Sequence, residues 1–141
     1  MPITETRGVR NRNPGNIDYS PANQWLGQLE PDPAVEKRFA RFDTPENGIR
    51  ALGKVLLTYQ RKHGLKTVKA IISRWAPSVE NDTVAYVRAV EANTGTQPGA
   101  EIDLARAPVM AGFVKAIIHH ENSGYAYPES VLAEGVRRAL A

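Results

Sequence analysis

The sequence has 141 residues, 42% hydrophobic and 23% charged, with a formal net charge of +3 and an isoelectric point near 9.3. This is the composition of a single globular domain with one core. No stretch approaches the ~18 apolar residues of a membrane span, and no basic head followed by an apolar run marks a signal peptide. Because cysteine is absent, disulfides, thiol nucleophiles and cysteine metal sites are excluded. The mild basicity suits a polyanionic partner, but the basic residues are spread along the chain, which favours an ordinary solvated surface.

Residues 1–43 differ from the rest of the chain, since they hold five of the ten prolines and only short apolar stretches. The run Asn13-Pro14-Gly15-Asn16 is typical of a tight turn, because it combines a fixed φ with residues that tolerate a positive φ. The alternating segment KRFARFD, residues 37–43, predicts a short strand. We therefore expect residues 1–43 to form an irregular β-hairpin lobe. We also expect this lobe to fold back beside the end of the fourth predicted helix, which spans about Ala107 to His120.

From residue 43 onward, apolar residues recur at helical spacing between capping residues. Five helices are predicted: from the Asp43-Thr44-Pro45-Glu46 cap to His63, from the Thr67 cap to Trp75, from the Asn81-Asp82-Thr83 cap to just before Gly95, from about Ala107 to His120, and from about Pro128 to Leu140. The fourth is apolar on most of its circumference, which places it in the middle of the domain. The expected fold class is α+β, mainly helical, with a β lobe (1–43) and a helical lobe (44–141).

The fourth helix ends in an unusual way, in the segment AIIHHENSGYAY (116–127), which contains the lone carboxylate Glu121. A carboxyl group there meets the negative end of the helix dipole, and apolar neighbours would desolvate it, so both effects disfavour its charged form. A general acid working near neutral pH must carry a proton, which makes Glu121 a candidate catalytic acid. The alternative is a solvent-facing residue just past a helix end, and spacing alone leaves that alternative open.

The three histidines do not predict a metal site. His119 and His120 are adjacent on a helix and point ~100° apart, and His63 is most simply a helix cap. The sequence has no phosphate loop, no dinucleotide fingerprint and no Gly-x-Ser-x-Gly motif, so we expect no metal and no cofactor.

Several aromatic and polar residues have two open interpretations. Trp25 is either a platform for sugar stacking or a core anchor, and Tyr125 and Tyr127 either line a cleft or pack against the body of the domain. Glu80 and Asn81 precede a helix, where capping is the first explanation and polar recognition the second.

Three segments near the start, RNRNPGNI, WLGQ and RFARFDTPENGIRAL, together resemble a family of small phage and prophage proteins, some of them labelled virion structural proteins. The same order resembles the hairpin segment of glucosaminidase-type, lysozyme-like peptidoglycan hydrolases. Further on, ENDTVAYVRAV is similar to a late helix of lytic transglycosylases, and VKAIIHHENSG is similar to their catalytic helix. In ordinary lysozyme-like enzymes the helix with the catalytic Glu precedes the hairpin, whereas here it follows, which indicates a circular permutation.

The resemblance implies cleavage of peptidoglycan glycan strands by a lysozyme or lytic transglycosylase in which Glu121 serves as general acid and then as base. It also implies a glycan cleft, and we expect five side chains to shape or line it: Asn13, Asn16, Trp25, Tyr86 and Tyr125. A lytic transglycosylase can work with one Glu and yields an anhydro product. A hydrolase using two carboxyl groups needs a second one ~5–9.5 Å away. The acids of the β lobe that could supply it are Asp18, Glu30, Glu36 and Asp43.

The expected partner is bacterial peptidoglycan, and we expect a monomer that binds no nucleic acid. The protein would be carried in the phage virion, or held in the host cytoplasm before release, and would act on the cell wall in the periplasm. Two other classes remain open. A non-catalytic virion or wall-binding protein would bind sacculi without clearing them, and a basic nucleic-acid-binding domain would bind DNA in a salt-dependent manner.

Overall fold

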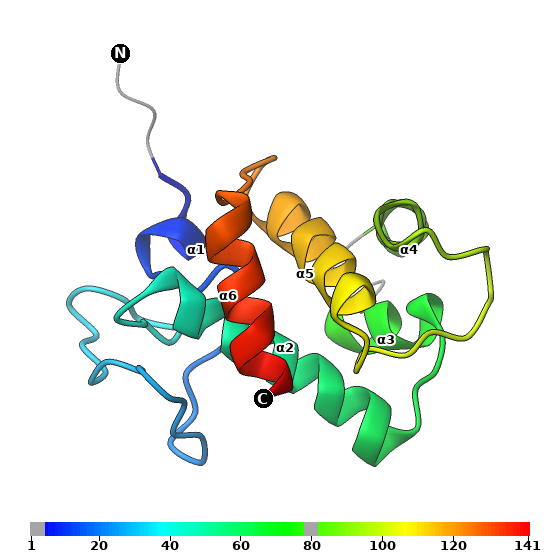
Figure 1. Cartoon of the computed structure of the whole chain (residues 1–141). Helices are drawn as coiled ribbons and strands as arrows, with labels where there is room; N and C mark the ends of the chain where they lie inside the picture. Colours follow the sequence, from blue (N-terminus) through cyan, green and yellow to red (C-terminus); the bar gives the residue numbers. More distant parts are fainter. Residues whose placement is uncertain (1–4, 78–81) are drawn as a thin grey trace.

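A computed structural model of the chain describes residues 5–77 and 82–141, and these form a helical fold (Figure 1). Its helices are α1 (Arg7–Arg10), α2 (Pro45–His63), α3 (Val68–Trp75), α4 (Thr83–Thr94), α5 (Ala107–Glu121) and α6 (Glu129–Leu140). The five predicted helices are therefore confirmed, whereas α1 was not predicted. Of the residues with two interpretations, Glu80 and Asn81 lie outside the described residues.

The helix ends follow from the capping residues that the sequence supplies. The side chains of Thr44, Thr67 and Asp82 each accept a hydrogen bond from the backbone N–H three residues further on. Gly64 and Gly95 end α2 and α4 in the left-handed conformation, with φ of 65° and 68°.

The predicted α+β class with a β-hairpin lobe is wrong. Within residues 5–77 and 82–141 there is no strand. The β pairing found there consists of isolated bridges, such as Asp18 with Phe39 and Gln28 with Phe42. After α1, residues 11–44 run as turns and extended segments. The prolines scattered through these residues cannot donate to a ladder, so no two segments stay paired for long. The expected lysozyme-like, circularly permuted architecture depended on that hairpin lobe and is not shown.

Helix α5 occupies the middle of the helical part, as predicted, between α6 on one side and α3 and α4 on the other (Figure 1). Its side chains Met110, Phe113 and Ile117 are fully buried. Helix α2 packs closely along α6 because glycine lies at the contact. A Cβ built on Gly53 would lie 2.6 Å from that of Ala139. No helix in the described part of the chain combines the length and hydropathy that crossing a bilayer requires.

The segment from α1 to residue 43 lies against the start of α2. Gly48 allows this approach, since a Cβ there would overlap the backbone carbonyl of Arg12. Asn13 organises the segment from within, because its amide donates to the carbonyls of Ile17 and Ala40, both at 2.9 Å, and accepts from the N–H of Ile17 at 3.0 Å. The N-terminal segment thus takes its shape from side-chain to backbone hydrogen bonds instead of from a sheet.

Candidate active site

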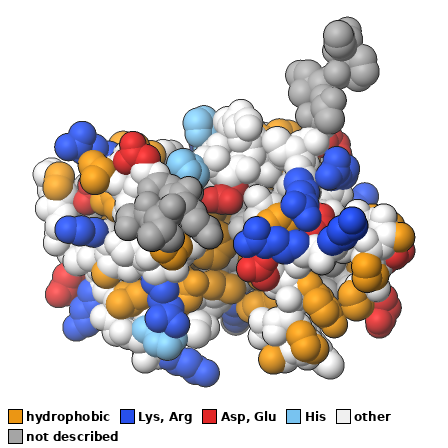
Figure 2. Space-filling model, turned by 180° about the vertical axis from the view of Figure 1, so that it is seen from behind, with side chains coloured by type: hydrophobic (Ala, Val, Ile, Leu, Met, Phe, Trp, Pro, Cys, Tyr) orange, Lys and Arg blue, Asp and Glu red, His pale blue; other side chains and the backbone are white. Residues whose placement is uncertain are grey.

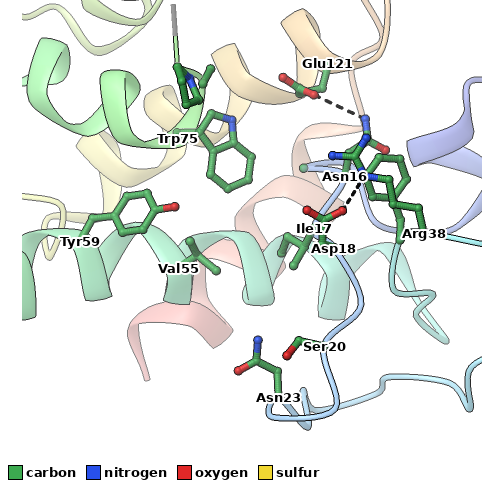
Figure 3. Close-up of a pocket in the computed structure, with 14 residues that line it drawn as sticks. Asn16, Ile17, Asp18, Ser20, Asn23, Arg38, Val55, Tyr59, Trp75 and Glu121 are labelled. Carbon is green, nitrogen blue, oxygen red and sulfur yellow. Dashed lines mark hydrogen bonds and ion pairs between the residues drawn. The ribbon is translucent and has the colours of Figure 1, made fainter. Parts of the chain in front are cut away.

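A hollow of about 600 Å³ separates the N-terminal segment from the helical part of the molecule (Figure 3). One wall carries Val55 and Tyr59 of α2 and Trp75 of α3, the opposite wall comes from residues 15–23 and 38–39, and Glu121 points in from the end of α5. Figure 2 shows the face seen from behind, with hydrophobic side chains exposed in its middle and Lys and Arg gathered on the side of the N-terminal segment. The hollow is open and mostly polar, and its volume is in the range of small-ligand sites.

Glu121 is half-buried, and each of its carboxyl oxygens faces one uncharged donor. The Asn16 amide donates to Oε1 at 3.5 Å, and the Tyr86 hydroxyl donates to Oε2 at 3.3 Å. Asn16 reaches this position from a left-handed turn with φ of 51°, which asparagine tolerates better than most residues. No ion pair found within the described residues involves Glu121. The carboxyl group is therefore oriented by uncharged donors.

Tyr86 lies directly behind Glu121 and is fully buried. Its burial raises the pKa of its hydroxyl far above the ordinary value, and the nearby charge of Glu121 adds to this, so the phenol stays protonated and remains a donor. The hydroxyl also has a side-chain hydrogen bond with Trp75, whose indole N–H can only donate. The ring of His120 stacks on the phenol with centroids 3.7 Å apart. Trp75, Tyr86 and Glu121 thus form a connected chain that ends at the carboxyl group.

Asn122 ties the N-terminal segment to the end of α5, next to Glu121. It is 1% exposed, and its amide donates to the carbonyls of Pro14 at 2.8 Å and Ile118 at 2.9 Å. Its Oδ1 accepts from the Thr6 hydroxyl at 2.8 Å. The expectation that the N-terminal region folds back beside the end of this helix is confirmed by these bonds. Sequence reasoning missed the role of Asn122, although an asparagine just after a helix is a recognisable cap signal.

The opposite wall of the pocket holds the carboxylate of Asp18. Its Oδ1 accepts from Nε of Arg38 at 2.7 Å, and both side chains are about 62% exposed. The guanidinium groups of Arg7 and Arg38 both lie over the ring of Phe39, at 4.6 Å and 4.8 Å from its centroid. Cation–π contacts of this kind fix the aromatic edge of the pocket.

The other three acids named as candidates for a second carboxylate do not line this pocket. Glu36 is buried, and its hydrogen bonds with Arg7 hold its pKa far below the ordinary value. The hydrogen bond from Asn47, 2.9 Å long, lowers the pKa of Asp43. Glu30 lines a neighbouring hollow instead. Asp18 is therefore the acid of this set that shares a cavity with Glu121.

Of the five side chains predicted to shape the cleft, two contact Glu121: Asn16, which lines the pocket, and Tyr86, which lies behind it. Asn13 is fully buried with its amide engaged by backbone groups, so it supports the turn and does not reach the pocket surface. Trp25 is half-buried and lines the neighbouring hollow. Tyr125 is 39% exposed, packs edge-on against Tyr127 and is not among the residues that line the pocket.

No protein-family model matches the sequence. Over 131 residues the chain is 37% identical to Protein P5 of Pseudoalteromonas phage PM2. The match covers 92% of this chain and 79% of that protein. The chain therefore belongs to the phage protein family that includes Protein P5 of phage PM2.

Proposed function

We propose that this phage-family protein cleaves the glycan strands of bacterial peptidoglycan, with Glu121 as its general acid. The observation that carries the proposal is the setting of that carboxyl group. It projects into an open hollow of about 600 Å³, and its two oxygens are held by an amide and a phenol. Both donors are uncharged, so they orient the carboxyl group without forming an ion pair with it. Glu36 shows the opposite case, because its arginine keeps it charged.

The walls of the hollow suit a sugar chain. Trp75 and Tyr59 supply flat apolar surfaces on the helical side, and Asn16, Ser20 and Asn23 supply amide and hydroxyl groups on the other (Figure 3). Pyranose rings present apolar faces and equatorial hydroxyl groups, and N-acetyl groups pair with amides. The described residues include no cluster of His, Cys, Asp and Glu that could hold a metal ion.

Glu121 takes part in the reaction by first donating a proton and then accepting one. Protonated Glu121 donates its proton to the glycosidic oxygen, the bond to the anomeric carbon breaks, and the leaving sugar takes the proton away. The resulting carboxylate then accepts a proton from the attacking hydroxyl group. Water as nucleophile gives a reducing end, and the muramyl 6-hydroxyl gives an anhydro end. Asp18, on the opposite wall, is the candidate second carboxylate for the route that uses water.

The test is Glu121→Gln, which keeps the size of the side chain and removes the proton. General acid catalysis typically supplies about 10²–10⁴-fold, so clearing of purified sacculi should slow by at least that lower bound. Glu129→Gln is the matched control, since it changes an exposed glutamate of α6 whose ion pair, in the described part of the chain, is with Lys115. Mass spectrometry of the released muropeptides identifies the nucleophile. If Glu121→Gln clears sacculi as fast as the wild type, the assignment is wrong.

A second outcome would support the alternative function. If the wild type sediments with sacculi but never clears them, the protein is a non-catalytic wall-binding or virion protein. Its membership of a phage protein family is compatible with that role.

A further inference from the structure

We infer that a second hollow beside the catalytic pocket is a saccharide-binding site that holds the next part of the glycan chain, with Tyr19, Asn23 and Trp25 as its main contacts. This inference rests on the proposed function for the identity of its ligand. It assigns a role to Tyr19 and to residues 24–31, which the catalytic proposal leaves without one.

The two hollows adjoin each other in the N-terminal segment. The second has a volume of about 370 Å³ and is lined by residues between 19 and 31. Asn23 lines both hollows. Residues 18–20 are extended, held by the hydrogen bond from Tyr19 N–H to the Arg38 carbonyl at 2.9 Å. Side chains alternate along such a segment, so Asp18 and Ser20 face the catalytic pocket while Tyr19 faces the second hollow. A chain leaving the first hollow past Asn23 therefore enters the second.

The aromatic part of the second hollow is fixed in place. Trp25 packs against the small core of Ala40, Phe42 and Ala51 with its indole nitrogen buried, and it lines the second hollow. The Trp25 backbone N–H donates to the Gln28 side chain at 3.0 Å. A ring whose position is set before binding loses little entropy when a sugar stacks on it.

The polar part of the hollow remains available for a ligand. The side-chain amides of Asn23 and Gln24 make no hydrogen bond with any of the described residues, and both residues are exposed. Tyr19 adds a ring that is 39% exposed. The one charged side chain in the lining is Glu30, which disfavours a phosphate backbone as the ligand. Uncharged amides beside exposed aromatic rings instead match the hydroxyl and N-acetyl groups of an amino-sugar chain.

The experiment measures the affinity of Glu121→Gln protein, which cannot consume its ligand, for N-acetylglucosamine oligosaccharides of increasing length. Affinity should rise with length until both hollows are filled. Adding Tyr19→Ala should remove that rise, lowering the affinity for long oligosaccharides about tenfold while leaving that for the disaccharide unchanged. Val35→Ala is the matched control, because Val35 is a 63% exposed hydrophobic residue of the same segment outside both hollows. Thermal melting of both variants checks that they fold.

The outcomes separate this inference from the proposed function. If Tyr19→Ala binds every length as tightly as the Val35→Ala control, the second site is refuted, even if the wild type cleaves sacculi. If the wild type cleaves nothing but shows length-dependent binding that requires Tyr19, the cleavage proposal fails and the saccharide site stands.

Discussion

Glu36 gives the sharpest prediction about how the pocket is built. Its side chain is 3% exposed and accepts five hydrogen bonds: from Arg7 Nε at 2.8 Å and Nη2 at 2.6 Å, from Asn11 Nδ2 at 2.9 Å, and from the backbone N–H groups of Arg38 and Phe39, both at 2.8 Å. The last two bonds hold the part of the chain that forms one wall of the pocket. This buried carboxylate therefore connects α1 to the pocket wall.

The substitution Glu36→Gln removes the charge and turns one acceptor oxygen into a donor that faces other donors. Breaking a buried ion pair typically costs about 3–5 kcal/mol. Arg7 is 45% exposed and water can rehydrate it, so we expect the lower end, about 3 kcal/mol. For a chain of 141 residues, an unfolding entropy of about 2.1 cal/mol/K per residue converts this into a Tm lower by roughly 10 °C. Urea unfolding and thermal melting at neutral pH measure both quantities.

The same substitution has a distinct pH signature. Because the folded protein holds the pKa of Glu36 far below its ordinary value of 4.5, the carboxylate contributes its full stabilisation above that value. The contribution is lost progressively as pH falls below about 4.5 toward the lowered pKa. The difference in unfolding free energy between wild type and Glu36→Gln should therefore be largest at neutral pH and shrink in acid.

Glu134 is the matched control. It is paired with two arginines, Arg137 and Arg138, both at 2.7 Å, and its pKa is lowered to about 2, but its side chain is 33% exposed, against 3% for Glu36. Water replaces such contacts, so Glu134→Gln should leave the melting temperature nearly unchanged. The reasoning is refuted if Glu36→Gln and Glu134→Gln melt together at neutral pH, or if the effect of Glu36→Gln does not diminish in acid.

Two further predictions concern the residues that hold Glu121 in place. Tyr86→Phe keeps the buried ring and removes the donor that orients the Glu121 carboxyl group, so sacculus clearing should slow about tenfold, a part of the about 10²–10⁴-fold that general acid catalysis supplies. Clearing at the wild-type rate by a folded Tyr86→Phe protein would show that this bond does not position the acid. Asn122→Asp removes the amide that donates to Pro14, and should lower stability by about 2 kcal/mol and speed proteolysis of the N-terminal segment. Asn93→Asp is the control, since the exposed Asn93 donates its amide to the Ala89 carbonyl within α4, and equal proteolysis of the two variants would contradict the tethering role.

The helices were predictable because their signals are local. Thr44, Thr67 and Asp82 cap helices by bonding to N–H groups three residues away, so a short window of sequence contains both partners. Similarly, the apolar spacing of residues 107–120 predicts a buried helix even when the helices that pack against it are not known. The position of Glu121 at the end of that helix follows from the same pattern.

The N-terminal segment was not predictable on these grounds. Ala40 and Phe42 face a small core while Phe39 faces the pocket, so the segment does alternate as an extended chain does. A sheet also requires a partner whose register matches, and sequence alternation says nothing about that partner. Asn13 was misassigned for a related reason: an amide suited to a sugar is equally suited to the backbone of its own turn.

The bonds that assemble the pocket join opposite ends of the chain. Thr6 and Asn122 are 116 positions apart, Pro14 and Asn122 are 108 apart, and Asn16 and Glu121 are 105 apart. Contacts of such high sequence separation are favourable only after the intervening chain has been ordered, so they form late in folding. On the ribosome, the N-terminal segment can pack on the start of α2, but Pro14 and Asn16 lack their partners Asn122 and Glu121 until α5 has been synthesised. The carboxyl group and its pocket therefore come together only when nearly the whole chain has emerged, and unfinished chains carry no assembled site.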